Sequence, residues 1–305
     1  MTKVFIDGSA GTTGLRIYER LSGRSDLELL ILPDELRKNP DARRRMLSLA
    51  DIAFLCLPDK AAMEAVSLIE NDHVAVIDTS TAHRTNDAWA YGFAELSPAH
   101  REAIRNSKRI ANPGCHASGF IAGCYPLVAN GIVPADFPLT AYSLTGYSGG
   151  GKALIAEYEA ADRDVRHESH RIYGTTLQHK HLPEMQKLCG LKYQPVFSPI
   201  LGDFYAGMAT SILLPGFDAQ KVWECLADHY VGQRIVTVAP FGGDESLVYA
   251  STYAGLDTMR IQVTGHSEQT MVTTIFDNLG KGASGAAIQN MNILLGVDET
   301  TGLNV

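Results

Sequence analysis

In roughly the first 110 residues, short apolar runs alternate with longer stretches in which apolar residues recur at helical spacing. The runs lie at 3–7, 27–32, 51–58 and 74–78, and the helical stretches lie within 8–21, 36–49 and 60–70. In the first helix, the apolar side should carry Leu15, Ile17 (or Tyr18) and Leu21. Strands that are apolar throughout and alternate with helices predict an α/β domain, a doubly wound parallel sheet of the kind that binds nucleotides.

The periodicity changes in the second half of the chain, where several runs alternate between apolar and polar positions. Expected strands lie at 139–146, 194–200, 205–214, 234–240, 259–265 and 270–276, and helices at 152–162, 219–230 and 277–296. The order of these elements predicts an α+β domain built on a mixed or antiparallel sheet.

Composition narrows the class of protein. The 305 residues carry a formal net charge of −8, and the longest basic block, "ARRR" at 42–45, lies in a helical stretch and should be solvated, so we expect no nucleic-acid partner. No apolar run approaches the ~20 residues of a membrane span, and no export signal is recognisable, so we expect no membrane partner. Five cysteines, an odd number, then predict free thiols and a cytoplasmic protein.

Three glycines, Gly8, Gly11 and Gly14, directly follow the first strand and open the first helix. Glycine lets backbone amides approach a phosphate closely, and the helix N-terminus favours its negative charge. We therefore predict a dinucleotide site, the alternative being a tight turn without ligand. Polar side chains of the same loop complete the expected site, namely Ser9, Thr12 and Thr13.

The residues after the second strand do not decide between NAD and NADP. Asp34 would repel a ribose 2′-phosphate, whereas Arg37 and Lys38 would hold it.

Cys115 follows Asn112, Pro113 and Gly114 and begins a stretch that reads as an amphipathic helix. A sulfur at a helix N-terminus is favoured as the thiolate, and the same amides can hold an oxyanion. We interpret Cys115 as a catalytic nucleophile and assign Asn112 to substrate binding. The alternative, a buried structural cysteine, is what we expect of the cysteines at 56, 189 and 225. Cys124 should lie about 180° around the helix from Cys115, so it cannot act as a resolving partner.

A thiolate nucleophile needs a group that carries protons, and "HKHLPEM" at 179–185 offers two histidines. Glu184 follows His181 by three positions and could orient its ring, so we favour His181 over His179. A surface histidine pair is the alternative. No third ligand lies nearby, so we expect no metal site. His116 should point away from the thiol, and we discount it.

The loop after the fourth strand, at 78–84, lies at the carboxyl edge where open sheets bind ligands. Ser80 is expected to meet the cofactor, and Arg84 to bind a phosphate or carboxylate. A solvated arginine is the alternative. The glycine-rich stretch 146–152 is either a substrate lid or a turn.

Together these motifs resemble the N-acetyl-γ-glutamyl-phosphate reductase family in its shorter form. The matching stretches run nearly end to end: "FIDGSAGTTGL", "DIAFLCLPD", "VIDTSTAHR", "YGFAEL", "ANPGCHASG", "TGYSGGGK", "HKHLPEM" and "DNLGKGASGAAIQNM". In the glycine loop, "GSAG" replaces the "GEHG"-like stretch expected of the family, which could weaken a cofactor contact.

The resemblance implies an NADPH-dependent reduction of an acyl phosphate to an aldehyde in arginine biosynthesis, through a thioester on Cys115. It implies that the catalytic histidine lies in the His-x-His motif and that Arg84 contacts substrate phosphate. It also implies a C-terminal helix that returns to the nicotinamide, with Asn278 at its start. We therefore expect a Rossmann-type dinucleotide-binding domain at 1–112 with 278–305, a catalytic domain at 113–277, and a homo-oligomer, either dimer or tetramer. The alternatives are a dehydrogenase of the same fold that uses aspartyl phosphate, and a non-catalytic nucleotide sensor.

Overall fold

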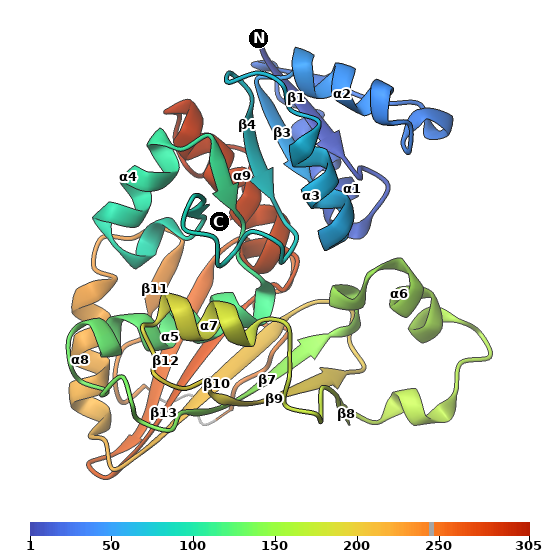
Figure 1. Ribbon diagram of the computed structural model, residues 1–305. Helices are drawn as coiled ribbons and strands as arrows, with labels where there is room; N and C mark the ends of the chain where they lie inside the picture. The colour runs from blue at the N-terminus through green and yellow to red at the C-terminus, as the bar shows by residue number, and fades with distance from the viewer. Residues whose placement is uncertain (244–246) are drawn as a thin grey trace. The chain divides into compact units, whose positions relative to one another are not determined.

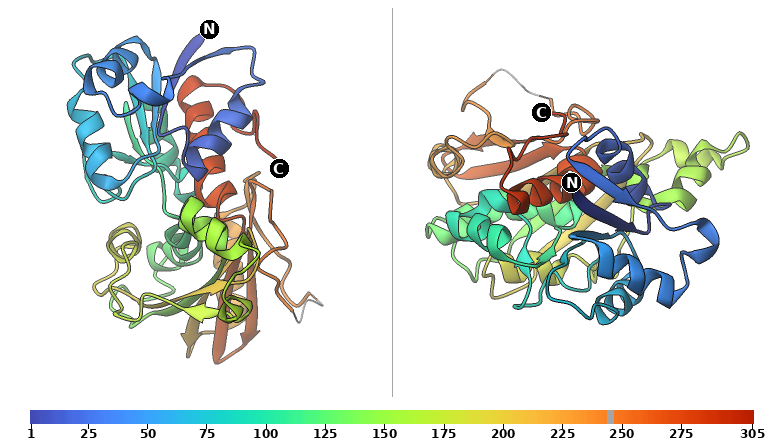
Figure 2. Two further views of the ribbon diagram at one scale, coloured as in Figure 1. Left: turned by 90° about the vertical axis from the view of Figure 1, so that its right-hand side faces the viewer. Right: turned by 90° about the horizontal axis from the view of Figure 1, so that it is seen from above.

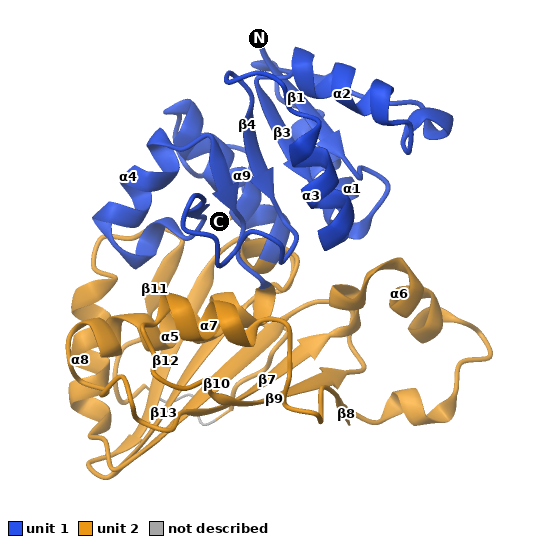
Figure 3. Ribbon diagram, in the orientation of Figure 1, with its two compact units in different colours: residues 1–114, 283–303 blue, residues 115–282, 304–305 orange. Residues whose placement is uncertain are grey.

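The computed structural model describes residues 1–243 and 247–305, which form two compact units (Figure 3). Unit 1 comprises Met1–Gly114 and Ala283–Leu303, and unit 2 comprises Cys115–Gly282 and Asn304–Val305. The chain thus leaves unit 1 immediately before Cys115 and returns to it at Ala283, a few residues after the position expected from the sequence.

Unit 1 is built on a sheet in which each pair of neighbouring strands is parallel, in the order β2-β1-β3-β4-β6-β5. The strands are β1 (Thr2–Asp7), β2 (Leu27–Leu30), β3 (Ile52–Leu55), β4 (Ala75–Asp78), β5 (Ala90–Tyr91) and β6 (Arg109–Ala111). From β1 the chain first adds β2 on one side and then β3 on the other, so the direction of winding reverses there. This reversal confirms the doubly wound fold and marks the carboxyl ends of β1 and β3 as a ligand-binding position.

Helices cover both faces of this sheet, as the strand pattern predicts. They are α1 (Thr12–Leu21), α2 (Pro40–Leu49), α3 (Asp59–Ser67), α4 (Pro98–Asn106) and α9 (Gly285–Leu295). Val4 and Ile6 of β1 pack in one core with α1 and α9, whereas Phe5 between them packs in another with α2. Figure 2 shows α9 in red beside α1 in blue, although the two are far apart in the sequence.

Two predictions about these helices are wrong. Leu15 of the expected apolar side is 40% exposed, whereas Ile17 and Leu21 are buried as expected. The basic block at 42–45 is not wholly solvated, because Arg43 is buried and its Nη2 lies 2.8 Å from Asp7 Oδ2. A buried carboxylate at the end of β1 requires a partner, and α2 supplies the arginine.

Unit 2 is built on a mixed sheet in the order β11-β12-β13-β10-β7-β9-β8. Its strands are β7 (Thr140–Gly146), β8 (Arg171–Ile172), β9 (Val196–Gly202), β10 (Met208–Pro215), β11 (Val236–Val238), β12 (Met259–His266) and β13 (Gln269–Phe276). The pairs β7–β9 and β11–β12 are parallel, and the other pairs are antiparallel. The predicted α+β class is therefore confirmed.

Helix α5 (Cys115–Ala129) packs on β10 and β13, and α7 (Leu182–Leu188) and α8 (Ala219–His229) pack against it (Figure 1). Eleven of its fifteen residues are buried, so the expected amphipathic helix is in fact a core helix. Glycine allows this close packing, because a Cβ on Gly119 would lie 2.6 Å from Thr210 Oγ1 on the sheet.

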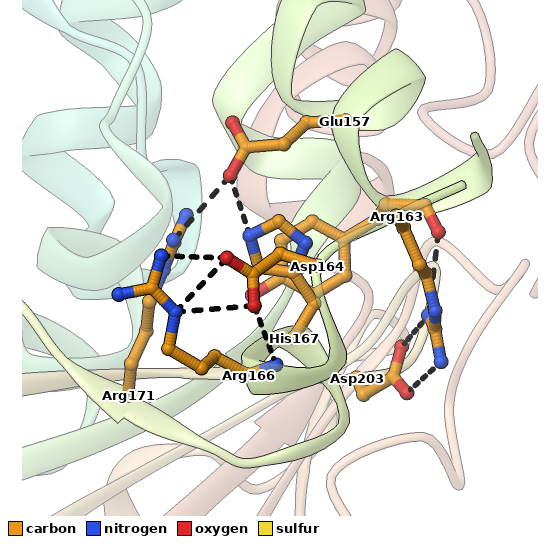
Figure 4. Close-up of polar contacts among 8 residues, drawn as sticks. Glu157, Arg163, Asp164, Arg166, His167, Arg171 and Asp203 are labelled. Atoms are coloured by element: carbon orange, nitrogen blue, oxygen red, sulfur yellow. Dashed lines mark hydrogen bonds and ion pairs between the residues drawn. The ribbon is translucent and has the colours of Figure 1, made fainter.

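The stretch 146–152 forms the turn Tyr147–Gly150 and the start of α6 (Gly151–Glu159). Charged side chains hold the segment that follows α6, as Figure 4 shows. Arg163 donates two hydrogen bonds to Asp203, at 2.8 and 2.9 Å, and Glu157 accepts from His167 and Arg171. The bidentate pair fixes the segment to the residue that follows β9.

The expected helix at 277–296 is shorter than predicted. A π-helical turn, Gly280–Ser284, comes first, and α9 begins at Gly285. Among the helices of residues 1–243 and 247–305, none has the length and apolar content required to cross a membrane.

Candidate active site

The glycine loop of unit 1 depends on the absence of side chains. Gly8 has φ +90°, and a Cβ there would collide with the carbonyl oxygen of Cys56. A Cβ on Gly14 would collide with the carbonyl oxygen of Gly8. Gly11 precedes α1, and no side chain caps that helix. The loop therefore brings the N-terminus of α1 to the carboxyl end of β1, where the switch in winding predicts a ligand.

The polar groups of this loop fit a phosphate. Thr12 Oγ1 is buried and has no hydrogen-bond partner within the described residues. Ser9 in the loop and Thr13 in the first turn of α1 are half-buried. A buried hydroxyl without a partner beside uncapped helix amides is the arrangement that a pyrophosphate would complete.

The residues after β2 leave the choice of dinucleotide open. Asp34 would repel a 2′-phosphate and Arg37 would hold it. The two residues form an ion pair with each other, with Arg37 Nη2 3.0 Å from Asp34 Oδ2.

A buried polar cluster follows β4. Asp78 is fully buried and accepts hydrogen bonds from the amide and the hydroxyl of Ser80, at 2.9 and 2.7 Å. His83 Nδ1 lies 2.6 Å from the same carboxylate, and its ring stacks on Trp89. The Ser80 hydroxyl is thus held in place by Asp78, which the sequence did not reveal.

Arg84 is buried, not a solvated loop arginine. Its Nε donates to the carbonyl oxygen of Asn112 and its Nη2 to that of Thr79, both at 2.8 Å. The Asn112 side chain donates to Ala283 and accepts from Asn290. Arg84 therefore joins the end of β4 to the end of β6. The residue that it holds after β6, Asn112, lies two positions before Gly114.

Cys115 is the first residue of α5, as predicted, and is half-buried. Gly282 approaches it closely, since a Cβ on that glycine would lie 3.1 Å from Cys115 Cβ. Burial raises the pKa of the Cys56 thiol to about 12 and that of Cys189 well above its usual value. Those two cysteines have the environment of structural thiols.

Three histidines cluster in unit 2, and two of them, His116 and His179, also contact the Phe197 ring. The ring of His116 lies 5.3 Å from His179 and 5.8 Å from His181, and the last two rings are 4.8 Å apart. His116, which its expected position on the helix led us to discount, lies in the same cluster as the two histidines of the motif. Position on the helix was a poor guide because α5 is buried on all sides.

The two motif histidines have different surroundings. His179 Nδ1 accepts a hydrogen bond from the His181 amide at 3.2 Å, so a neutral ring carries its proton on Nε2. Burial and the charge of Lys180 lower the pKa of His179 to about 4. His181 is buried immediately before α7, and Glu184 is buried in the first turn of that helix.

Asn278 lies in unit 2, and both ends of its side chain are bonded there. Its Oδ1 accepts from the Gly207 amide at 2.8 Å, and its Nδ2 donates to Ser148 Oγ at 3.0 Å. It thus fixes the turn that precedes α6. Within the described residues, no group of three or more His, Cys, Asp or Glu side chains is placed to hold a metal ion.

Comparison with known proteins identifies the family. The models for the semialdehyde dehydrogenase dimerisation domain and NAD binding domain match residues 115–278 and 32–106. The chain is 43% identical to N-acetyl-γ-glutamyl-phosphate reductase 2 of Nostoc sp. over 99% of both chains. It is 46% identical to the N-acetyl-γ-glutamyl-phosphate reductase of Chelativorans sp., covering 96% of this chain and 98% of that one. The chain belongs to the N-acetyl-γ-glutamyl-phosphate reductase family.

Membership of the N-acetyl-γ-glutamyl-phosphate reductase family confirms the resemblance drawn from the motifs. Among solved structures, aspartate semialdehyde dehydrogenase II of Vibrio cholerae matches with a TM-score of 0.72, covering 97% of this chain and 98% of that one. The enzyme from Francisella tularensis also gives 0.72, covering 97% and 100%. Their sequence identities of 17% and 13% mean that these matches support the fold alone.

One residue of the histidine cluster carried no signal in the sequence argument. The Tyr173 hydroxyl lies 2.6 Å from His116 Nε2. Tyr173 directly follows β8, an edge strand of two residues that periodicity cannot detect. A tyrosine six residues before the His-x-His motif could have been considered, but nothing in the sequence connected it with His116.

Proposed function

We propose that this protein reduces N-acetyl-γ-glutamyl phosphate to N-acetylglutamate 5-semialdehyde with NADPH and releases phosphate, as a step of arginine biosynthesis. The observation that carries the proposal is the thiol of Cys115 at the N-terminus of a buried helix, in a chain of this family. The helix amides favour a thiolate and can stabilise an oxyanion beside it.

The protein's part in the reaction begins with attack of the Cys115 thiolate on the acyl carbon. The bond from that carbon to the phosphate oxygen breaks, phosphate leaves, and a thioester remains on Cys115. NADPH, when bound, supplies the hydride that reduces the thioester carbon. The C–S bond of the resulting thiohemiacetal then breaks, which releases the aldehyde and returns the thiol.

One imidazole near Cys115 would carry the protons of these steps. We assign this role to His181, with Glu184 orienting it and His179 as the alternative. The clustering of both rings in unit 2, the unit that contains Cys115, supports a histidine in this role. It does not choose between them.

The binding groups are assigned by their chemistry. The proposed cofactor site consists of the glycine loop with its hydroxyl side chains, together with Ser80 and Asn278. Arg84 and Asn112 are proposed to bind substrate, since two backbone carbonyls hold the Arg84 guanidinium in place at the carboxyl edge of the sheet.

The reverse reaction tests the function directly. Purified protein should reduce NADP⁺ when N-acetylglutamate semialdehyde and phosphate are both present, and much more slowly when either is omitted. Aspartate semialdehyde is the matched control for the alternative substrate. Nucleotide binding without turnover of either aldehyde would support a sensor and exclude the proposed enzyme.

We also propose that the protein is a homo-oligomer, dimer or tetramer, of the cytoplasm. The match to a dimerisation domain supports the first point. The five cysteines, all among the described residues, are free thiols, which supports a reducing compartment. Sedimentation equilibrium would give the number of subunits, and a monomer at micromolar concentration would contradict the proposal.

A further inference from the structure

A chain of four hydrogen-bonded side chains starts beside Cys115 in the sequence and has no role in the mechanism above. His116 Nδ1 lies 2.8 Å from Ser143 Oγ, which lies 2.8 Å from Thr210 Oγ1. On its other side, His116 Nε2 lies 2.6 Å from the Tyr173 hydroxyl. We call this set, Thr210, Ser143, His116 and Tyr173, the His116 chain.

Only one end of the His116 chain is accessible. Thr210 and Ser143 are fully buried and His116 is 3% exposed, whereas Tyr173 is half-buried. The Tyr173 hydroxyl is thus the end at which the chain can meet a ligand.

The accessible end of the His116 chain is bonded to the residue that follows Cys115 in α5, and the chain is uncharged at neutral pH. The pKa of Tyr173 is raised by burial and by the charge of Cys115. Burial lowers the pKa of His116 to about 3. At neutral pH the phenol is therefore protonated and the imidazole uncharged, so the chain can donate a hydrogen bond without becoming charged itself.

The hydrogen count of the chain allows the phenolic proton to point outward. Thr210 can donate to Ser143, Ser143 to His116 Nδ1, and His116 Nε2–H to the Tyr173 oxygen. Linked donors of this kind reinforce one another. No proton has to leave the chain.

We propose that Tyr173 donates a hydrogen bond to the acyl oxygen during acyl transfer to Cys115, and that His116 positions Tyr173. The inference rests on the proposed role of Cys115 as the nucleophile. When the thiolate adds to a carbonyl carbon, negative charge develops on the carbonyl oxygen. A fixed donor at that oxygen stabilises the transition state more than the substrate.

The test compares two reactions of the same thiol. Acylation by p-nitrophenyl acetate develops charge on a carbonyl oxygen and releases p-nitrophenolate, whereas alkylation by iodoacetamide involves no such oxygen. Tyr173→Phe should slow the acylation burst by ~10²-fold, as expected for loss of an oxyanion donor. It should leave the rate of alkylation and its pH dependence unchanged.

Tyr230→Phe is the matched control. Its hydroxyl is also buried and donates to α5, at the Ala122 carbonyl oxygen 2.9 Å away, but it lies further along the helix from Cys115. Both rates of this variant should equal those of the wild type. Similar thermal melting curves for the two variants would establish that neither acts through unfolding.

His116 variants test its positioning role. His116→Leu should slow acylation about as much as Tyr173→Phe, and the double variant should be no slower than either, because both act on one donor. His116→Gln should restore part of the rate, since its amide can donate to the Tyr173 oxygen.

Two results would overturn the inference: an unchanged acylation burst in Tyr173→Phe, or equal losses of acylation and alkylation, which would mean that Tyr173 acts on the thiol. Failure of the proposed function looks different. In that case the wild type would show the p-nitrophenolate burst but no NADP⁺ reduction with N-acetylglutamate semialdehyde and phosphate.

Discussion

At the scale of single residues, the proposed chemistry lies at Cys115, the first residue of α5, where Gly282 closely approaches the Cys115 Cβ. Cys115→Ser and Cys115→Ala should therefore abolish turnover, since a hydroxyl is barely ionised at neutral pH. Binding of NADP should persist, because the glycine loop belongs to unit 1. Steady-state kinetics and a fluorescence titration with NADP would measure the two effects. Substantial activity in Cys115→Ala would rule out the covalent mechanism.

The proton carrier is tested by replacing each motif histidine separately. His181→Asn should lower turnover by ~10²–10⁴-fold, the usual value of general acid–base help, with little change in NADP binding. His179→Asn is the matched control in the same cluster and should have a smaller effect. The reverse order of effects would show that His179, whose neutral ring carries its proton on Nε2, is the acid–base group.

Arg84 holds two backbone carbonyls and is also the proposed phosphate ligand. Arg84→Lys keeps the positive charge but loses the planar guanidinium with its several N–H donors. It should therefore raise the KM for phosphate in the reverse reaction. The KM for NADP⁺ should change little. Saturation curves for both substrates would measure this selectivity. Equal changes in both constants would instead indicate that Arg84 acts by joining β4 and β6.

The candidate site illustrates what a sequence reveals at this scale. Cys115 was recognisable because the preceding proline and glycine and the following helix are local features, and the structure places it where they indicated. His116 and Tyr173 were missed because their meeting depends on how α5 and the residue after β8 pack in unit 2. Local spacing carries no information about such contacts.

At the scale of elements, α2 differs from the expected solvated helix because Arg43 faces Asp7. Burial raises the pKa of Asp7, against the lowering effect of the Arg43 charge. Arg43→Met should destabilise the protein by ~3 kcal/mol, since it leaves a buried carboxylate without its partner. Adding Asp7→Asn should recover part of that loss. Urea unfolding of both variants would measure it, with the exposed Arg45→Met as the control.

Helix α5 shows why an element can be recognised while its environment is misjudged. Its range was predictable from the proline and glycine before Cys115. Its burial was not, because α7 and α8 cover the side that does not face the sheet. Short edge strands such as β5 and β8, of two residues each, were also missed, since two residues show no periodicity.

At the scale of the whole molecule, the order of elements was the most predictable property. Apolar strands that alternate with helices predict a parallel sheet. After residue 138, runs in which apolar and polar positions alternate predict a second sheet. The pairing order within that second sheet was not predictable. It depends on which distant strands meet, and β10 and β13 pair across more than fifty intervening residues.

The buried histidines should make the stability of the whole molecule depend on pH. The pKa values of His116 and His179 are lowered to about 3 and about 4, chiefly by burial. Between those values and ~6.5, the unfolded chain binds protons at these rings that the native chain does not, so stability falls as pH falls. Each ring contributes a slope of up to ~1.4 kcal/mol per pH unit below pH ~6.

Urea unfolding at pH 7.5, 6.5, 5.5 and 5.0 would measure this dependence. The free energy of unfolding should change little between pH 7.5 and 6.5 and should fall at pH 5.5 and 5.0. His116→Gln should reduce the fall in unfolding free energy by up to the part that one buried histidine contributes. Replacement of the exposed His170 should leave the fall unchanged. An identical decline in His116→Gln would mean that His116 is protonated in the native protein, which would also remove the neutral imidazole on which the His116 chain depends.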